Sequence, residues 1–277
     1  MVFIAILLAL ALERFFDWSH LRRWQWFEQY CQMLSSSIDR FNPAVRLACW
    51  LLPPVLLVGL IEYILSGWIY GIVRLVFDFF VLLYCFGPTN FWAQLYDCLQ
   101  PMSQGDPQLV DVRVKAAFPE VTAPTPQALH QTLVRAIYIE GERRVFGVLF
   151  WFSVFGPMGA VLYRLIALAQ NKTITEMAVL TSKAQELADW LPSRVLGIFF
   201  ALGGHFVKVL TVWQKYALQG INTSDILIAE TGLAALDLPA NKPVAENGEV
   251  EKQAIQLFDR ALIIMLLLSA VLALVLP

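Results

Sequence analysis

Charged side chains occur inside long apolar segments of this sequence, where they are costly to bury in a membrane. Glu62, Arg74 and Asp78 lie in two apolar stretches that are separated only by Ser66 and Gly67. Arg74 and Asp78 are four residues apart and therefore share one face of a helix, and Glu62 precedes the turn about as far as Arg74 follows it. The sequence predicts an ion-pair cluster that fixes a helical hairpin. A proton or ion relay is the alternative, because intramembrane charges are often functional.

A second group of polar side chains lies at the ends of the other apolar segments. Arginine donates paired hydrogen bonds to carboxylate and phosphate groups, so its arginines are candidates for holding an anionic ligand, with Asp189 orienting Arg194. Structural ion pairs and side chains that reach toward the membrane surface are the alternative. The predicted ligand-binding residues are Arg14, Arg143, Tyr163, Arg164, Asp189, Arg194 and His205.

The sequence lacks the motifs of common catalytic, metal and nucleotide sites. Its four cysteines form no C-x-x-C pair and it contains only three histidines, so no zinc or redox site is predicted. There is no G-x-x-x-x-G-K-[ST], H-E-x-x-H or G-x-S-x-G motif. We therefore predict no metal, no cofactor and no catalytic residue, and we favour a non-enzymatic function over an enzymatic one.

The composition predicts that membrane helices carry these side chains. Of the 277 residues, 58% are hydrophobic and 15% are charged, whereas soluble domains are about half apolar and a quarter charged. These proportions exclude an ordinary soluble enzyme and a disordered chain. The net charge of −2 argues against a nucleic-acid partner. The partner that the composition implies is the lipid bilayer.

About 20 predominantly apolar residues are needed for a helix to cross a bilayer. We therefore predict an all-α fold, a polytopic membrane bundle of about five to six transmembrane helices with amphipathic interfacial helices, forming a single domain over residues 1–277. The predicted spans are residues 1–16, 44–66, 68–87, 146–168, 194–213 and 260–276. Predicted polar loops cover residues 88–132 and 214–258, and predicted interfacial helices lie within 17–43 and 171–191.

Further features concern the ends and the middle of the chain. Met1–Leu12 is apolar without a basic flank or a small-residue cleavage site, so we expect a retained first helix rather than a signal peptide. Lys and Arg are mildly enriched in the first, third and fifth loops, at residues 13–46, 88–145 and 208–260. By the positive-inside rule these loops are cytoplasmic, which places both termini in the periplasm. Gly156-Pro157 interrupts the span at 146–168 and predicts a broken or re-entrant helix.

Three groups of residues, taken together, resemble the AmpE family of bacterial inner-membrane proteins. They are Glu13-Arg14-Phe15-Phe16; Leu149-Phe150-Trp151 with Gly156-Pro157-x-Gly159-Ala160-x-x-Tyr163-Arg164; and Asp189-Trp190-x-Pro192-x-Arg194-x-x-Gly197-x-x-Phe200-Ala201-Leu202-x-Gly204-His205. That family is tied to β-lactamase induction and is encoded beside AmpD, a muropeptide amidase. The resemblance implies a multi-pass inner-membrane regulator or sensor in cell-wall signalling, an anionic cell-wall-derived ligand and a functional link to AmpD.

The same motifs are similar to those of the CobD/CbiB family, membrane enzymes that join an aminopropanol phosphate to cobyric acid in cobalamin assembly. The shared elements are F-W, G-x-x-G-A-x-x-Y-R and D-x-x-P-x-R. Where those enzymes carry N-T-L-D-x-M after the Tyr-Arg pair, this chain has Leu165-Ile166-Ala167-Leu168. A CobD/CbiB-like amide ligase is therefore the alternative function. A small-solute transporter is a second alternative, supported only by Glu62, Arg74 and Asp78.

Overall fold

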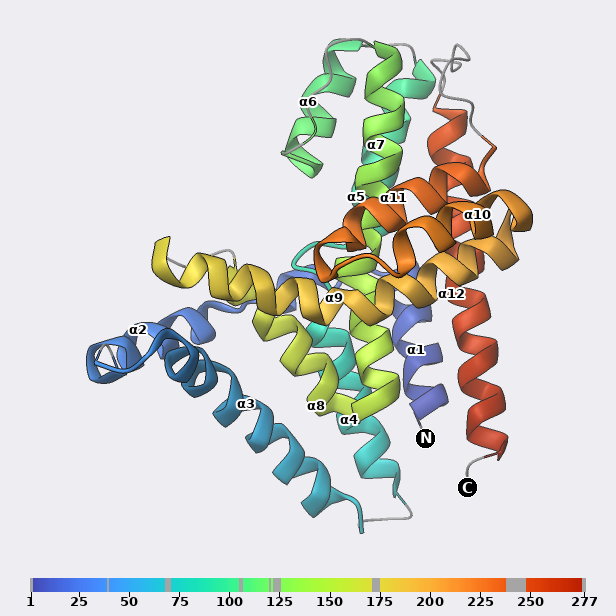
Figure 1. The fold of residues 1–277 in the computed structure, drawn as a ribbon. Coiled ribbons are helices and arrows are strands. Elements are labelled where there is room, and N and C mark those ends of the chain that lie inside the picture. The colour runs from blue at the N-terminus through green and yellow to red at the C-terminus, as the bar shows by residue number, and fades with distance from the viewer. Residues whose placement is uncertain are drawn as a thin grey trace. The chain divides into compact units, whose positions relative to one another are not determined.

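The computed structural model describes residues 2–38, 40–67, 71–104, 107–119, 121, 126–170, 175–237 and 248–275. Within these ranges the secondary structure is helical and includes no strand (Figure 1), which confirms the predicted all-α fold class. The elements in chain order are α1 (Val2–Phe15), η1 (Ser19–Leu21), α2 (Gln25–Ile38), α3 (Pro43–Leu65), α4 (Ile72–Cys85), α5 (Phe91–Gln104), α6 (Pro107–Ala117), α7 (Pro126–Gly141), the π-helix η3 (Glu142–Phe146), α8 (Gly147–Gln170), α9 (Thr175–Gly203), α10 (Phe206–Ala217), η4 (Ile221–Thr223), α11 (Ser224–Ala235) and α12 (Glu249–Val275).

The helices form two compact units, each assembled from separate stretches of the chain. The first unit contains residues 1–89, 147–188 and 269–277, and the second contains residues 90–146 and 189–268. In the first unit α4 packs against α1 and α8, and α3 packs against α8 and α2. In the second unit α11 packs against α7 and α10, and α5 packs against α6.

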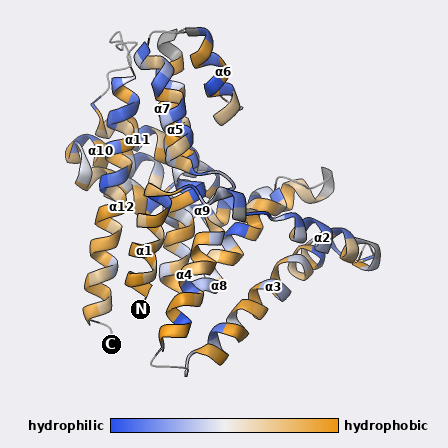
Figure 2. Cartoon of the chain, turned by 180° about the vertical axis from the view of Figure 1, so that it is seen from behind, coloured by the Kyte–Doolittle hydropathy of each residue, from blue (hydrophilic) through white to orange (hydrophobic). Residues whose placement is uncertain are grey.

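Three helical segments among the described residues are long and apolar enough to cross a membrane. They are Pro43–Leu65, Leu129–Gln170 and Glu249–Val275, and they overlap the predicted spans at 44–66, 146–168 and 260–276. In Figure 2 the ribbons of α3, α8 and the later part of α12 have mostly the colour of hydrophobic residues. The predicted count of five to six spans is not confirmed, because α1 and α4 have only 14 residues each.

The predicted span at 194–213 is wrong as a continuous helix. Helix α9 begins within the predicted interfacial segment and continues through Pro192 to Gly203, and α10 starts only at Phe206. The chain turns here because it packs closely on the end of α11. A Cβ atom at Gly204 would lie 2.8 Å from the Ala235 carbonyl oxygen, and the His205 N–H donates to that same oxygen at 3.3 Å.

The predicted polar loops are also largely helical where the structure describes them. Residues 88–132 contain α5, α6 and the start of α7, and residues 214–258 contain α11 and the start of α12. The prolines of the first segment are compatible with helices: Pro107 and Pro126 occupy the first positions of α6 and α7, where a missing N–H removes no helical hydrogen bond. Residues 238–247 of the second predicted loop lie outside the described residues.

Cys98 provides a test of the helical pairing of α5 and α6. Its thiol is buried and donates to the Arg113 carbonyl at 3.6 Å, and burial raises the pKa of this thiol to about 11. Because the thiolate is the reactive form, only about one molecule in a thousand is reactive at pH 8. In a variant that keeps Cys98 as its single cysteine, we expect the alkylation rate by iodoacetamide to rise about tenfold per pH unit between pH 8 and pH 10. A rate that levels off below pH 9 would place Cys98 on an open loop.

Gly156 forms the break that the sequence predicts inside the span at 146–168. Its backbone has φ of 64° and ψ of −153°, a region that is essentially restricted to glycine. The following Pro157 also excludes a helical conformation at this position. The side-chain oxygens of Glu62 lie 3.4 and 3.6 Å from where a Cβ at Gly156 would stand, so the bare backbone admits the carboxylate of a neighbouring helix.

Gly156→Ala is therefore expected to lower the free energy of unfolding by about 1–3 kcal/mol. The matched control is Gly67→Ala, because a Cβ at Gly67 meets no atom within 4 Å and its backbone is not in the glycine-only region. Thermal unfolding of the two detergent-purified variants measures the difference. Equal melting temperatures for both would show that the break at Gly156 carries no strain.

Candidate functional site

The candidate site in the second unit is built on a change of helix type. The helix that begins at Pro126 becomes a π-helix over Glu142–Phe146 before continuing as α8. A π-turn inserts extra backbone, redirects its side chains and is often found at functional sites. Here it sends Glu142 into the interior, where the residue is 0% exposed, while the neighbouring Arg143 side chain keeps 32% exposure.

Glu142 is an unusual buried carboxylate. Among the described residues neither of its side-chain oxygens has a hydrogen-bond partner, although burying an unpaired polar group is normally costly. The charges that act on it are those of Asp189, Arg143, Asp225 and Arg194. Glu142 is not among the predicted ligand-binding residues. The sequence alone does not show which carboxylate between Glu140 and Arg144 is buried.

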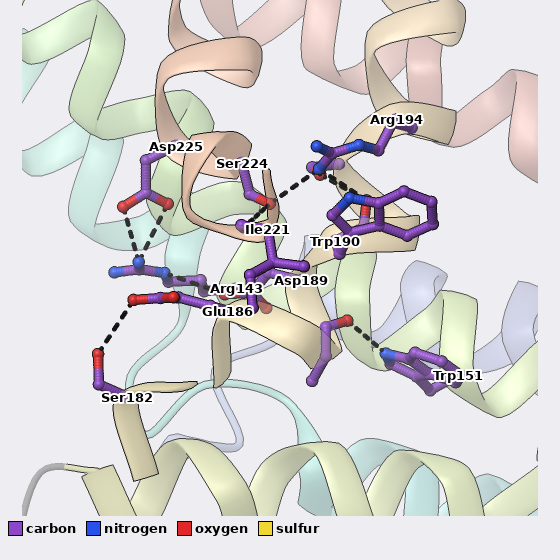
Figure 3. A network of polar contacts seen from close by, with 12 residues as sticks. Arg143, Trp151, Ser182, Glu186, Asp189, Trp190, Arg194, Ile221, Ser224 and Asp225 are labelled. Atoms are coloured by element: carbon purple, nitrogen blue, oxygen red, sulfur yellow. Dashed lines mark hydrogen bonds and ion pairs between the residues drawn. The ribbon is translucent and has the colours of Figure 1, made fainter. Parts of the chain in front are cut away.

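Arg143 connects three elements of the second unit. Its Nη2 donates to both carboxylate oxygens of Asp225, at 2.8 and 3.0 Å, and its Nε lies 3.6 Å from Asp189 Oδ2. Figure 3 shows the guanidinium held between these side chains of α11 and α9. Asp189 is buried with 2% exposure, whereas the Asp225 side chain is 44% exposed. The cluster thus has a closed side at Asp189 and an open side at Asp225.

Arg194 has a different set of partners from the one predicted. Its guanidinium lies 4.7 Å from the centre of the Trp190 ring and donates to the Ser224 hydroxyl at 3.0 Å (Figure 3). Its remaining hydrogen-bond acceptors are the carbonyls of Trp190, Ala217, Gln219 and Gly220 and the hydroxyls of Ser193 and Thr223. Because arginine has five N–H groups, these partners occupy the guanidinium. Arg194 joins α9 to the connection between α10 and α11.

His205 lies at the start of α10 and is an exposed residue. Its Nε2 is 4.0 Å from Asp237 Oδ2, and its side chain is 58% exposed. Lys208 also pairs with Asp237. The four predicted residues of the second unit therefore have distinct surroundings: Arg143 and Asp189 contact each other, Arg194 holds a turn, and His205 pairs near the end of α11.

The other three predicted ligand residues belong to the first unit. Tyr163 and Arg164 are buried in α8, with 1% and 6% exposure. The Tyr163 ring and hydroxyl pack onto Gly147, where a Cβ would lie 2.5 Å from them. Arg14 lies in the last turn of α1 next to Glu13, which is buried and forms an ion pair with Arg22. The seven predicted residues are thus divided, three in the first unit and four in the second.

The ion pair of Glu13 and Arg22 was missed by the sequence analysis. Arg22 Nη1 donates to Glu13 Oε1 at 2.9 Å and to the Gly87 carbonyl at 3.0 Å. Its guanidinium also lies 5.8 Å from the centre of the Phe86 ring. The pair joins the end of α1 to the end of α4. In the sequence, the only signal for it is the position of Glu13 at the end of an apolar segment.

The three predicted intramembrane charges meet in the first unit. Arg74 Nη2 lies 2.5 Å from Glu62 Oε1, and Arg74 Nε lies 3.7 Å from Asp78 Oδ2. These contacts join α3 to α4 across the hairpin. In the part of the chain that the structure describes, no group of three or more His, Cys, Asp or Glu side chains is placed to hold a metal ion.

Comparisons with known proteins agree with the motif content. The family described as "Regulatory signalling modulator protein AmpE" matches residues 1–275. Among curated proteins, the chain is 26% identical over 146 residues to "Cobalamin biosynthesis protein CobD" of Chromobacterium violaceum, covering 50% of this chain and 47% of the relative. It is 28% identical over 130 residues to the protein of the same name from Stutzerimonas stutzeri, covering 45% and 43%.

The chain spans about half the length of the curated relatives that it matches. No solved structure matches it. Since the family match covers almost the whole sequence, the chain belongs to the AmpE family of regulatory signalling modulators, with distant similarity to CobD.

Proposed function

We propose that this protein is a multi-pass inner-membrane regulator of cell-wall signalling, linked to β-lactamase induction, that binds a muropeptide-type ligand at Arg143. The family's description as a signalling modulator supports the regulatory part of the proposal. The apolar helices Pro43–Leu65, Leu129–Gln170 and Glu249–Val275 support a membrane location. Both termini lie in the periplasm in this proposal, and the functional link to AmpD arises because that amidase consumes muropeptides.

The observation that carries the proposal is the partly exposed pair of Arg143 and Asp225. An exposed ion pair contributes only about 0–1 kcal/mol, so a ligand carboxylate can replace Asp225 on the guanidinium at little cost. Asp189, which is buried beside Arg143 Nε, keeps the guanidinium in place during the exchange. The ligand carboxylate then gains the paired hydrogen bonds that Asp225 gives up.

The charges around Arg143 favour a zwitterionic ligand over a purely anionic one. Two carboxylates, those of Asp189 and Asp225, already contact the single guanidinium of Arg143. A second negative charge on the ligand would meet this excess, whereas an ammonium group would be attracted by it. A peptide with free carboxylate and ammonium groups, as in a muropeptide, meets both requirements.

Exchange at Arg143 also provides a route for a signal. Asp225 is the second residue of α11, and its bond to Arg143 holds that helix to the π-helix. A ligand that takes the guanidinium removes this link between α11 and the π-helix. Because the ligand binds only the arrangement in which Arg143 has left Asp225, it shifts the population toward that arrangement.

Induction of β-lactamase in cells tests the proposed function. Cells that carry Arg143→Gln in place of the natural chain are expected to lose the response to β-lactam that depends on this protein. Arg135→Gln is the matched control, because Arg135 likewise forms an ion pair with α11, through Glu230 at 2.6 Å, from the helix α7 that precedes the π-helix, and is exposed to a similar degree. Loss of the response in both variants, or in neither, would contradict a ligand role for Arg143.

Amide-ligase chemistry is the second candidate function, favoured by the two similar proteins named CobD. It requires Mg-nucleotide and an amine acceptor, and the buried carboxylates Glu142 and Asp189 are the groups available near Arg143. Release of phosphate from Mg-ATP in the presence of a phosphoamino-alcohol and a carboxylic acid would support it. Absence of that turnover from protein that still binds a muropeptide would exclude it.

A further inference from the structure

The first unit contains an apolar groove that none of the charged residues explains. Its volume is about 770 Å³, and residues of α2, α3, α4 and α8 line it, together with Trp24 just before α2. Helices α3 and α4 meet at their hairpin and diverge away from it (Figure 1). The groove lies along this divergence.

The walls of the groove are aromatic and aliphatic. From α4 the lining residues are Phe77, Phe80, Val81 and Tyr84, whose spacing places them on one helical face. Two of the lining residues are largely exposed: Leu57 of α3 at 58% and Phe80 of α4 at 60%. Because α3 is apolar enough to lie within a membrane, large apolar side chains that stay uncovered along this groove are suited to contact with lipid chains.

One end of the groove is polar, and the Arg23 backbone lies there. Trp26 Nε1 donates to the Tyr84 hydroxyl at 2.9 Å, and that hydroxyl donates to the Arg23 carbonyl at 2.8 Å. The Arg23 side chain itself is exposed. Trp and Tyr with their polar atoms gathered in this way are typical of the level of lipid headgroups, and an arginine there attracts an anionic headgroup.

We infer that this groove binds one acyl chain of an anionic phospholipid, with its phosphate group against Arg23. The apolar walls formed by α3 and α4 match a hydrocarbon chain, and α3 is one of the helices long and apolar enough to lie within the membrane. Arg23, an exposed residue whose carbonyl accepts from Tyr84 at the aromatic end, supplies the charge that complements a phosphate. The lipid would hold α3 to α4 and α8 along the part of α3 that is distant from the hairpin.

Native mass spectrometry of the full-length protein in detergent tests this site. The probes are phosphatidylglycerol and phosphatidylethanolamine with identical acyl chains. We expect one phosphatidylglycerol per chain, bound about fivefold more tightly than phosphatidylethanolamine. Arg23→Gln should bring the two affinities together while leaving phosphatidylethanolamine binding unchanged.

Leu57→Trp and Leu56→Trp form a matched pair for the groove itself. The two leucines are adjacent on α3 and are 58% and 59% exposed, but only Leu57 lines the groove. Filling the groove with Leu57→Trp should weaken phosphatidylglycerol binding by about tenfold, and Leu56→Trp should leave it unchanged. Equal losses in both variants, equal affinity of the natural chain for the two lipids, or a dimer whose formation Leu57→Trp abolishes would overturn the assignment.

Discussion

Asp225→Asn is expected to tighten the binding of an anhydro-muropeptide, whereas Arg143→Gln is expected to abolish it. Asp225 competes with the ligand for the Arg143 guanidinium, so removing its charge frees the arginine. The gain is at most about fivefold, because an exposed ion pair contributes no more than about 1 kcal/mol. Loss of the guanidinium removes the group that binds the ligand carboxylate and leaves that carboxylate facing Asp189 and Asp225, so binding should no longer be detected.

Fluorescence anisotropy of a labelled anhydro-muropeptide, titrated with detergent-purified protein, measures both effects. The control pair is Arg135→Gln and Glu230→Gln, because these residues form a similar ion pair between α11 and α7, the helix that continues into the π-helix of Arg143. Neither control should change the affinity. If Arg143→Gln and Asp225→Asn altered the affinity in the same direction, the pair would be a structural link and not an exchange site.

Arg194→Ala is expected to produce the largest loss of stability among single substitutions of the charged residues. The guanidinium is buried and donates to four backbone carbonyls and three hydroxyls in three connected elements. Each buried acceptor left without a donor costs about 1–3 kcal/mol, so we expect a loss of at least about 3 kcal/mol. For a chain of this size, that corresponds to a fall of about 10 °C in melting temperature.

Arg260→Ala is the control for this prediction. Arg260 also donates to a backbone carbonyl at the end of α9, that of Gly203 at 3.2 Å, but it makes this single exposed contact. Its replacement should change the melting temperature by less than about 3 °C. Arg194→Lys should lie between the two, since an ammonium group has three donors and no planar geometry. A melting temperature for Arg194→Ala equal to that of Arg260→Ala would disprove the structural role.

The helical fold could be predicted from the sequence because its signals are local. Apolar segments such as 44–66 and 260–276 carry their own evidence in composition and length, and the break at Gly156-Pro157 follows from the two residue types. The boundaries of helices were harder to predict, because proline is compatible with loops and also with helices. Pro192 lies inside α9, and Pro107 and Pro126 begin helices.

The candidate site was predictable only in part, because its contacts join residues that are distant in sequence. Arg143 and Asp189 were selected by residue type, but Asp225 lies 82 positions from Arg143 and carries no motif. The π-helix that buries Glu142 has no signature in the sequence. Arg194 was predicted to bind an anion because its type suits one, while its actual acceptors are mostly backbone carbonyls, which every residue possesses.

Thermal unfolding of the detergent-purified protein with an anhydro-muropeptide tests the central claim most directly. At 100 times the dissociation constant, the ligand should stabilise the natural chain and Arg135→Gln by about 2.7 kcal/mol, and it should not stabilise Arg143→Gln. An equal shift in Arg143→Gln, or a shift with Mg-ATP alone, would contradict a muropeptide site at Arg143.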